Sequence, residues 1–235
     1  MTRRGKAIAW GAAAVVASLM LFMPLRFALA LFAPPQLTAA QAQGSIWSGR
    51  LDHAVIGGMD LGTLDVGLKP LALLTGKLSF GFTRAPGNAV EPLTGSLTSG
   101  ITGRGVSNVT GTVGSIASTI APSIRIVTQD FSVRFAGQDC ASASGQVRAI
   151  FATEFAGLSL RNGMSGEARC DGVALMLPMQ GDSGLEKLTL RLWADGRYTA
   201  RLTVTATDPT LSNALIAAGF APSADGFIKT TQGRY

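Results

Sequence analysis

An apolar run near the start of the chain, from Ala7 to Phe32, constrains everything that follows it. About 20 predominantly apolar residues are needed to cross a hydrocarbon core of roughly 30 Å as a helix, so the run is long enough for one transmembrane span. Only basic charges precede it, and the first acidic residue is Asp52. Under the positive-inside rule, residues 1–6 form a cytoplasmic tail and the rest of the chain lies across the membrane.

The apolar run has a second interpretation, as a secretory signal peptide. Ala28-Leu29-Ala30 has the small-x-small form that a signal peptidase accepts. The hydrophobic region of a signal peptide is usually about 7 to 15 residues long, which is shorter than this run. We therefore expect an uncleaved signal anchor over residues 7–32, with a cleaved signal peptide as the alternative. Both interpretations export the chain beyond about residue 34.

The net charge of +6 is a misleading guide to partners. Four of the positive charges, on Arg3, Arg4, Lys6 and Arg26, flank the apolar run, and without them the exported part carries +2. A nucleic-acid surface needs clustered cations, which this part lacks, so nucleic acid is not an expected partner. Charged residues make up only 14% of the chain, which favours contact with a membrane, other subunits or an apolar ligand.

Cys140 and Cys170 are the only cysteines, and both follow the apolar run. In an oxidising periplasm an even pair is expected to form a disulfide, with two buried free thiols as the alternative. His53 is the only histidine. Two cysteines and one histidine cannot supply a four-ligand zinc set, and we expect no metal or other cofactor.

Beyond the run, apolar and polar residues alternate with a period of two, which indicates half-buried strands. Such stretches occur at residues 64–68, 78–82, 124–126, 131–135, 147–151 and 173–177. The segments 188–192 and 198–204 flank Asp195-Gly196, which predicts a hairpin with a tight I′ turn. The Gly-, Ser- and Thr-rich segment 95–119 also contains regularly placed apolar residues, which favours strands in a meander over disorder.

One helix is predicted near the end of the chain. Asp208-Pro209 supplies a cap and a first-turn proline, Leu211, Leu215 and Ile216 share one face, and Gly219 ends the helix. The last apolar pair, at residues 227–228, suggests a short edge strand.

The chain is therefore predicted to be mainly β after its N-terminal transmembrane helix. Residues 33–43, which begin with paired prolines, form a linker. Residues 44–235 form a periplasmic domain built on a curved antiparallel sheet with one C-terminal helix. The alternation fits either a closed, barrel-like sheet or an open trough lined with apolar side chains.

Short motifs that resemble catalytic sites do not extend into complete signatures. Gly181-Asp182-Ser183-Gly184 copies the start of a serine-protease nucleophile stretch, with His53 upstream, but Leu185 and Glu186 end the match. Gly163-Met-Ser-Gly166 lacks the spacing of a nucleophile elbow, and Gly76-Lys77 lacks the earlier glycine of a P-loop. These segments are typical turns, and no catalytic residue is expected.

The most specific motif is Gly44-Ser45-Ile46-Trp47-Ser48-Gly49, followed by Leu68-x-Pro70-x-x-Leu73-Leu74-x-Gly76. With its N-terminal anchor and later cysteine pair, the chain resembles the type II secretion system protein N family, also called general secretion pathway protein N. Ile46 replaces the usual leucine, and Leu68-Lys69 stands where that family often has a Trp-rich strand. Trp47 is suited to packing an indole against a sheet, with Gly44 and Gly49 permitting close approach, so the motif is interpreted as structural.

The resemblance implies a non-enzymatic, single-pass inner-membrane component of the type II secretion system. Such a component supports export of folded periplasmic proteins across the outer membrane. Its expected partners are other type II secretion subunits and the inner membrane, with exported proteins or lipid as further candidates. The alternative hypothesis is an anchored periplasmic lipid-binding or lipid-transfer protein, in which the apolar trough shields an acyl chain.

Overall fold

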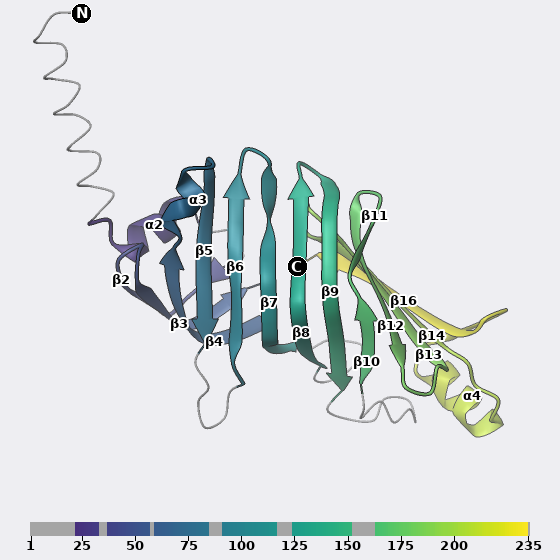
Figure 1. Cartoon of the computed structure of the whole chain (residues 1–235). Helices are drawn as coiled ribbons and strands as arrows, with labels where there is room; N and C mark the ends of the chain where they lie inside the picture. Colours follow the sequence, from purple (N-terminus) through teal and green to yellow (C-terminus); the bar gives the residue numbers. More distant parts are fainter. Residues whose placement is uncertain are drawn as a thin grey trace, which may run out of the picture.

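The computed structural model describes residues 22–32, 37–56, 59–84, 91–116, 124–151 and 163–234. Its strands form one antiparallel sheet of 16 strands, which twists so that the C-terminal strands cross behind β8 and β9 (Figure 1). The mainly β architecture predicted from the alternation of apolar and polar residues is therefore confirmed.

The elements follow one another along the chain with short connections. The N-terminal side contains α2 (Leu25–Phe32), β1 (Leu37–Thr38), β2 (Gln41–Gly44), β3 (Gly49–Ile56), β4 (Met59–Leu68), α3 (Pro70–Leu73), β5 (Lys77–Arg84), β6 (Leu93–Gly100) and β7 (Gly103–Ile116). The centre contains β8 (Ile124–Ala136), β9 (Asp139–Phe151), β10 (Met164–Glu167), β11 (Arg169–Asp171) and β12 (Ala174–Gly181). The C-terminal side contains β13 (Glu186–Trp193), β14 (Arg197–Val204), α4 (Pro209–Ala217), β15 (Ala221–Ser223) and β16 (Gly226–Arg234).

The sheet is a long meander with open ends. Strands β3 to β10 are neighbours in the order of the sequence, and β12, β13 and β14 continue the series. Strands β1 and β2 both pair with β3, while β15 occupies the other edge. Because the described strands at the two edges do not pair with each other, the open trough is the correct one of the two predicted arrangements. The last strand differs from the prediction: β16 is long and lies between β14 and β15.

The predicted hairpin between β13 and β14 is confirmed, but its turn type is not. Leu188 faces Leu202, and Leu192 faces Tyr198. The N–H of Gly196 donates to the carbonyl oxygen of Trp193, and Gly196 is the turn residue with positive φ. A type I′ turn needs positive φ at both central positions, so this connection is instead the three-residue loop that places a glycine in the left-handed conformation.

The predicted C-terminal helix is α4. The carboxylate of Asp208 accepts hydrogen bonds from the N–H groups of Thr210 and Leu211, as an N-cap residue does. Leu215 is fully buried and Leu211 packs beside the same core, while Ile216 is largely exposed. The helix therefore covers the sheet with a narrower apolar face than the predicted one.

Helix α2 belongs to the packing of the β domain. Pro24 forms a bridge with Ser45, and the N–H of Ile46 donates to the carbonyl oxygen of Met23 at 3.1 Å. Leu25 is only 2% exposed and lies in the core with Leu51, and burial of one such side chain is worth about 1.5 to 3 kcal/mol. The apolar run thus divides at Pro24, and its last residues lie against the sheet.

The first residues of the predicted anchor, 1–21, lie outside the described residues, as do residues 33–36 of the predicted linker. The described part of that linker is not irregular, since it forms β1 and β2. Within the described ranges, no helix combines the length and the apolar character that a membrane span requires.

Alternate side chains on one face of the sheet build the core. On the N-terminal side the cluster joins α2 to β3, β4, β6 and β7 through Leu25, Leu51, Leu64, Leu93 and Val109. A second cluster joins the middle strands to the C-terminal ones, and it includes Val133, Val147, Met164, Leu177, Leu202 and Leu215. The opposite face of β5 to β9 carries mainly glycine, serine and threonine, such as Ser96 facing Ser107.

Candidate functional site

The Gly44–Gly49 motif forms the loop that joins β2 to β3. Gly44 pairs with Gly49 at the base of the loop. The N–H of Ser45 donates to the carbonyl oxygen of Ser48 at 3.1 Å, and the Ser45 hydroxyl accepts from the N–H of Trp47 at 3.3 Å. Gly44 has φ +86°, and a Cβ there would lie 2.6 Å from the Ser48 oxygen. Only glycine fits this turn without strain.

This loop lies directly against β4. The N–H of Leu68 donates to the carbonyl oxygen of Ile46 at 2.8 Å, and a Cβ on Gly67 would lie 2.5 Å from the carbonyl oxygen of Trp47. Ile46 and Leu68 are buried together, and the half-buried Trp47 packs against them. The motif therefore fixes the way the loop crosses the sheet.

The second part of the motif forms the connection between β4 and β5 at the same end of the sheet. Pro70 starts the short helix α3, and Gly76 has φ +68° in the turn that follows it. The N–H of Lys69 donates to the carbonyl oxygen of Ser79 at 2.8 Å and closes the base of this connection. Gly44, Trp47 and Gly49 thus meet in one loop, while Pro70 and Gly76 shape the neighbouring one.

A shallow hollow of about 620 Å³ lies beside the Trp47 loop on the polar face of the sheet. Its lining includes Trp47, Arg50, Asp65, Gly67, Gly81 and Thr83. Gly67 and Gly81 face each other on β4 and β5, so the floor between them has no side chains. Arg50 forms an ion pair with Asp65 at 2.8 Å, and this hydrogen bond together with the charge of Asp65 raises the pKa of Arg50. The hollow is suited to a polar contact.

The close approach of the Trp47 loop to Gly67 leads to a matched pair of variants. Gly67→Ala is expected to lower the free energy of unfolding by about 1 to 3 kcal/mol, because the new methyl group would displace backbone. Gly81→Ala is the control, since its Cβ would meet only the flexible end of Lys69 at 3.1 Å, and its effect is expected to stay within about 0.5 kcal/mol. Urea denaturation of the full chain in detergent, followed by tryptophan fluorescence, compares them. Equal losses would contradict the proposed packing.

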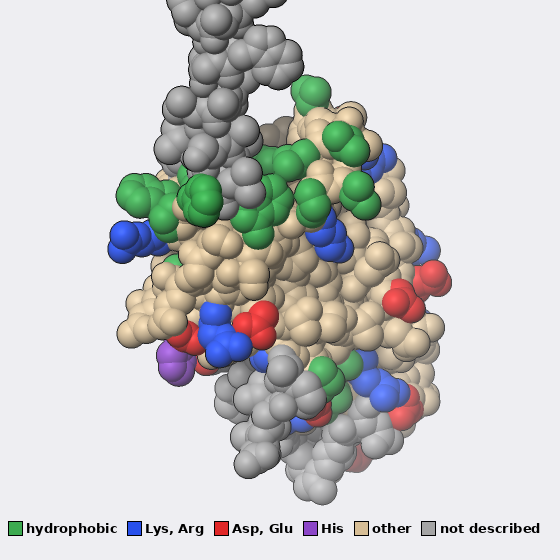
Figure 2. Space-filling model, turned by 60° about the vertical axis from the view of Figure 1, so that its left-hand side comes forward, with side chains coloured by type: hydrophobic (Ala, Val, Ile, Leu, Met, Phe, Trp, Pro, Cys, Tyr) green, Lys and Arg blue, Asp and Glu red, His purple; other side chains and the backbone are tan. Residues whose placement is uncertain are grey.

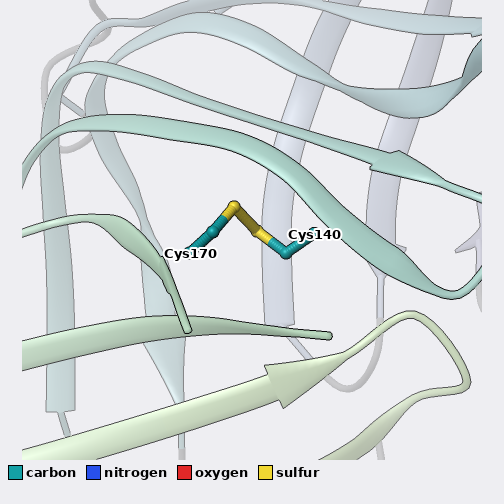
Figure 3. Close-up of a disulfide and its surroundings, with 2 residues drawn as sticks. All are labelled: Cys140 and Cys170. Atoms are coloured by element: carbon teal, nitrogen blue, oxygen red, sulfur yellow. A yellow bond between two sulfur atoms is a disulfide. The ribbon is translucent and has the colours of Figure 1, made fainter. Parts of the chain in front are cut away.

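Cys140 and Cys170 form the predicted disulfide (Figure 3). Cys140 is on β9 and Cys170 is on β11, and their Cα atoms are 5.5 Å apart. Cys140 is buried in the larger core cluster, and Cys170 packs against that cluster. The bond therefore holds the short strand β11 against the middle of the sheet.

The motifs that resemble a protease do not form a catalytic arrangement in the described residues. Ser183 lies in the turn between β12 and β13, where its hydroxyl donates to the carboxylate of Glu186 and accepts from the N–H of Leu185. His53 is exposed on β3, near the other end of the strand order, with φ +50°. In the same described part, no three His, Cys, Asp or Glu side chains gather as potential metal ligands.

Arg84 is a buried cation that the sequence interpretation did not single out. It is 5% exposed at the end of β5, and its guanidinium donates to the carbonyl oxygens of Leu61 at 2.7 Å, Glu91 at 3.0 Å and Thr112. Burial lowers the pKa of Arg84, and the charges of Asp60 and Glu91 partly oppose this. A signal existed: Arg84 continues the apolar phase of Leu78, Phe80 and Phe82 in an alternating strand.

The geometry defines the class of protein: an open antiparallel β domain whose most specific motif organises loops at one end of the sheet. A family model described as "Type II secretion system (T2SS), protein N" matches residues 35–231, and the chain belongs to this family. The resemblance stated from the sequence motifs is thereby confirmed. Comparison with curated proteins found no match, and neither did comparison with solved structures.

Proposed function

We propose that the chain is a non-enzymatic, single-pass inner-membrane component of the type II secretion system. It supports the export of folded periplasmic proteins across the outer membrane. The family match over residues 35–231 carries this proposal, because membership implies association with other type II secretion subunits. In the proposed topology residues 1–6 are cytoplasmic, the apolar run starting at Ala7 is the anchor, and the β domain is periplasmic.

Two structural features support a role based on contact in the periplasm. The disulfide between Cys140 and Cys170 suits an oxidising compartment. The open sheet leaves edge strands at both ends, at β1 and β2 and at β15, and such strands expose backbone groups to which another chain can pair. The polar hollow beside Trp47 offers a third surface for a secretion subunit or an exported protein.

The alternative hypothesis of lipid transfer gains no specific support from the described residues. The apolar face of the sheet is filled by its own clusters, which α2 and α4 help to close. The hollow beside Trp47 and a smaller one beside Arg104 are lined mainly by glycine, serine, threonine and charged residues. A site for an acyl chain would instead be lined mainly by apolar side chains.

In-cell photocrosslinking tests the proposed function. A photoreactive residue replaces Gln41 on β2, Arg50 in the hollow or Ser223 on β15, all of which are exposed. Full-length protein is used, and membranes are separated from the periplasm before crosslinked products are identified. We expect the chain in the inner-membrane fraction and a crosslink to a type II secretion subunit from at least one position. A chain recovered only from the soluble periplasm, without any such crosslink, would overturn the proposal.

A further inference from the structure

Exposed apolar side chains are concentrated in a few neighbouring segments of the described chain. Leu71 is 77% exposed, Leu74 84% and Ile101 96%. Phe22, Phe27 and Leu73 are also exposed. The other large exposed hydrophobic residues that the structure describes are Val173, Leu185 and Ile216, which are scattered over the C-terminal half. Single exposed hydrophobic residues are normal, but a gathered set indicates a contact surface.

Hydrogen bonds and close contacts place these segments at one end of the sheet. Met23 is bonded to Ile46, and Ile46 in turn to Leu68, immediately before α3. Beyond α3, a Cβ on Gly76 would lie 3.9 Å from Cδ1 of Ile101 in the β6–β7 turn. Figure 2 shows hydrophobic side chains, in green, gathered in a band across this end of the molecule. We name Phe22, Phe27, Leu71, Leu73, Leu74 and Ile101 the apolar rim.

The charge around the apolar rim is all of one sign. The segments that build this end, residues 22–32, 44–48, 68–79 and 97–105, contain Arg26, Lys69, Lys77 and Arg104 and no acidic residue. These four side chains are exposed. Apolar side chains flanked by Lys and Arg are the combination that binds an anionic membrane surface, with apolar groups about 5 to 10 Å below the headgroups.

The position of the rim in the chain also fits a membrane. The described chain begins at Phe22, directly after the apolar residues 7–21, and Met23 is already bonded to the sheet. There is thus hardly any linker between the proposed anchor and the β domain. As a helix, residues 7–21 would reach about 22 Å at 1.5 Å per residue, short of a hydrocarbon core of roughly 30 Å. Burying the rim in the interface would make up the difference.

We propose that the apolar rim lies in the outer leaflet of the inner membrane, with Leu71, Leu74 and Ile101 below the headgroups and Arg26, Lys69 and Lys77 against anionic lipid phosphates. This inference rests on the proposed function for its anchor only. The β domain is then held upright on the bilayer, with the ends of β3 to β7 opposite the rim directed into the periplasm. The edge strands and the hollow keep a fixed height above the membrane.

Depth-dependent quenching tests the rim. Full-length protein carrying Leu74→Cys or Ile101→Cys is labelled with an environment-sensitive fluorophore and reconstituted into vesicles of phosphatidylethanolamine and phosphatidylglycerol with shallow spin-labelled lipid. Leu185→Cys is the matched control, since Leu185 is exposed at the opposite end of β13 from the hairpin turn that contacts Arg104. We expect lipid quenching at least roughly threefold stronger at positions 74 and 101 than at 185, because only the rim enters the interface.

Two results would overturn parts of the inference. Equal quenching at 74, 101 and 185 would show that the rim stays in water. Unchanged quenching at 74 when phosphatidylcholine replaces phosphatidylglycerol would remove the contribution of the basic side chains. The vesicles contain no secretion subunit, so this experiment can fail while the secretion proposal stands, and a secretion assay can fail while the rim still binds lipid.

Discussion

Arg84→Ala is expected to lower the free energy of unfolding by about 3 kcal/mol, because three carbonyl acceptors lose a charged donor. The guanidinium joins the main chains of β4, the segment before β6, and β7, through Leu61, Glu91 and Thr112. Its side chain is almost completely buried, so water does not readily replace it. Urea denaturation of the full chain in detergent measures the loss.

Arg134→Met is the control for Arg84. Arg134 is exposed and makes only a long hydrogen bond, 3.4 Å, to the carbonyl oxygen of Thr102, so its replacement should cost less than about 0.5 kcal/mol. Arg84→Lys should give an intermediate loss, because a lysine ammonium cannot reproduce the planar fork of donors. If Arg84→Ala were no more destabilising than Arg134→Met, the carbonyl contacts would not contribute to stability as argued here.

Replacing both cysteines, Cys140→Ser with Cys170→Ser, is expected to lower the free energy of unfolding by a similar amount. The bond closes a loop with a sequence separation of 30, for which the chain-entropy relation gives about 3.5 kcal/mol. The loop includes β10 and β11, which are short strands. The same denaturation experiment measures the effect.

Reduction provides an internal control for the disulfide. Dithiothreitol should shift the unfolding midpoint of the unmodified protein toward that of the double serine variant, and should leave the variant unchanged. A reduced protein as stable as the oxidised one would contradict the expected contribution of the bond.

Local patterns in the sequence predicted much of the fold because they have local physical causes. The alternation at residues 78–82 follows from one buried and one exposed face of a strand, and β5 is found there. Asp208-Pro209 and Gly219 determine the two ends of α4 through capping. The disulfide followed from the cysteine pair together with the exported location of the chain.

Features that depend on contacts between distant segments were not predictable in the same way. An apolar run does not reveal where it passes from lipid to protein, so the packing of Leu25 against the β domain was not anticipated. Alternation does not specify which strands pair, so β16 was expected at an edge but lies inside the sheet. The partners of Arg84 come from three separate strands or connections, and only the fold brings them together.

The motif residues illustrate the same distinction. The glycines at 44, 49 and 76 predicted turns or close approach, and the structure places each of them at such a position. The sequence did not indicate that Gly67, outside the quoted motif, lies under the carbonyl of Trp47. This contact explains the geometry of the loop better than the tryptophan alone.

The fate of exported enzymes in a strain that lacks this chain tests the central claim most directly. Enzymes that use the type II pathway are assayed in the medium and in the periplasm, with the deletion strain complemented by the full chain or by residues 22–235 behind a cleavable signal peptide. We predict that the deletion leaves folded, active enzyme in the periplasm, and that only the anchored full chain restores its release. Unchanged release of these enzymes from the deletion strain would contradict a role in type II secretion.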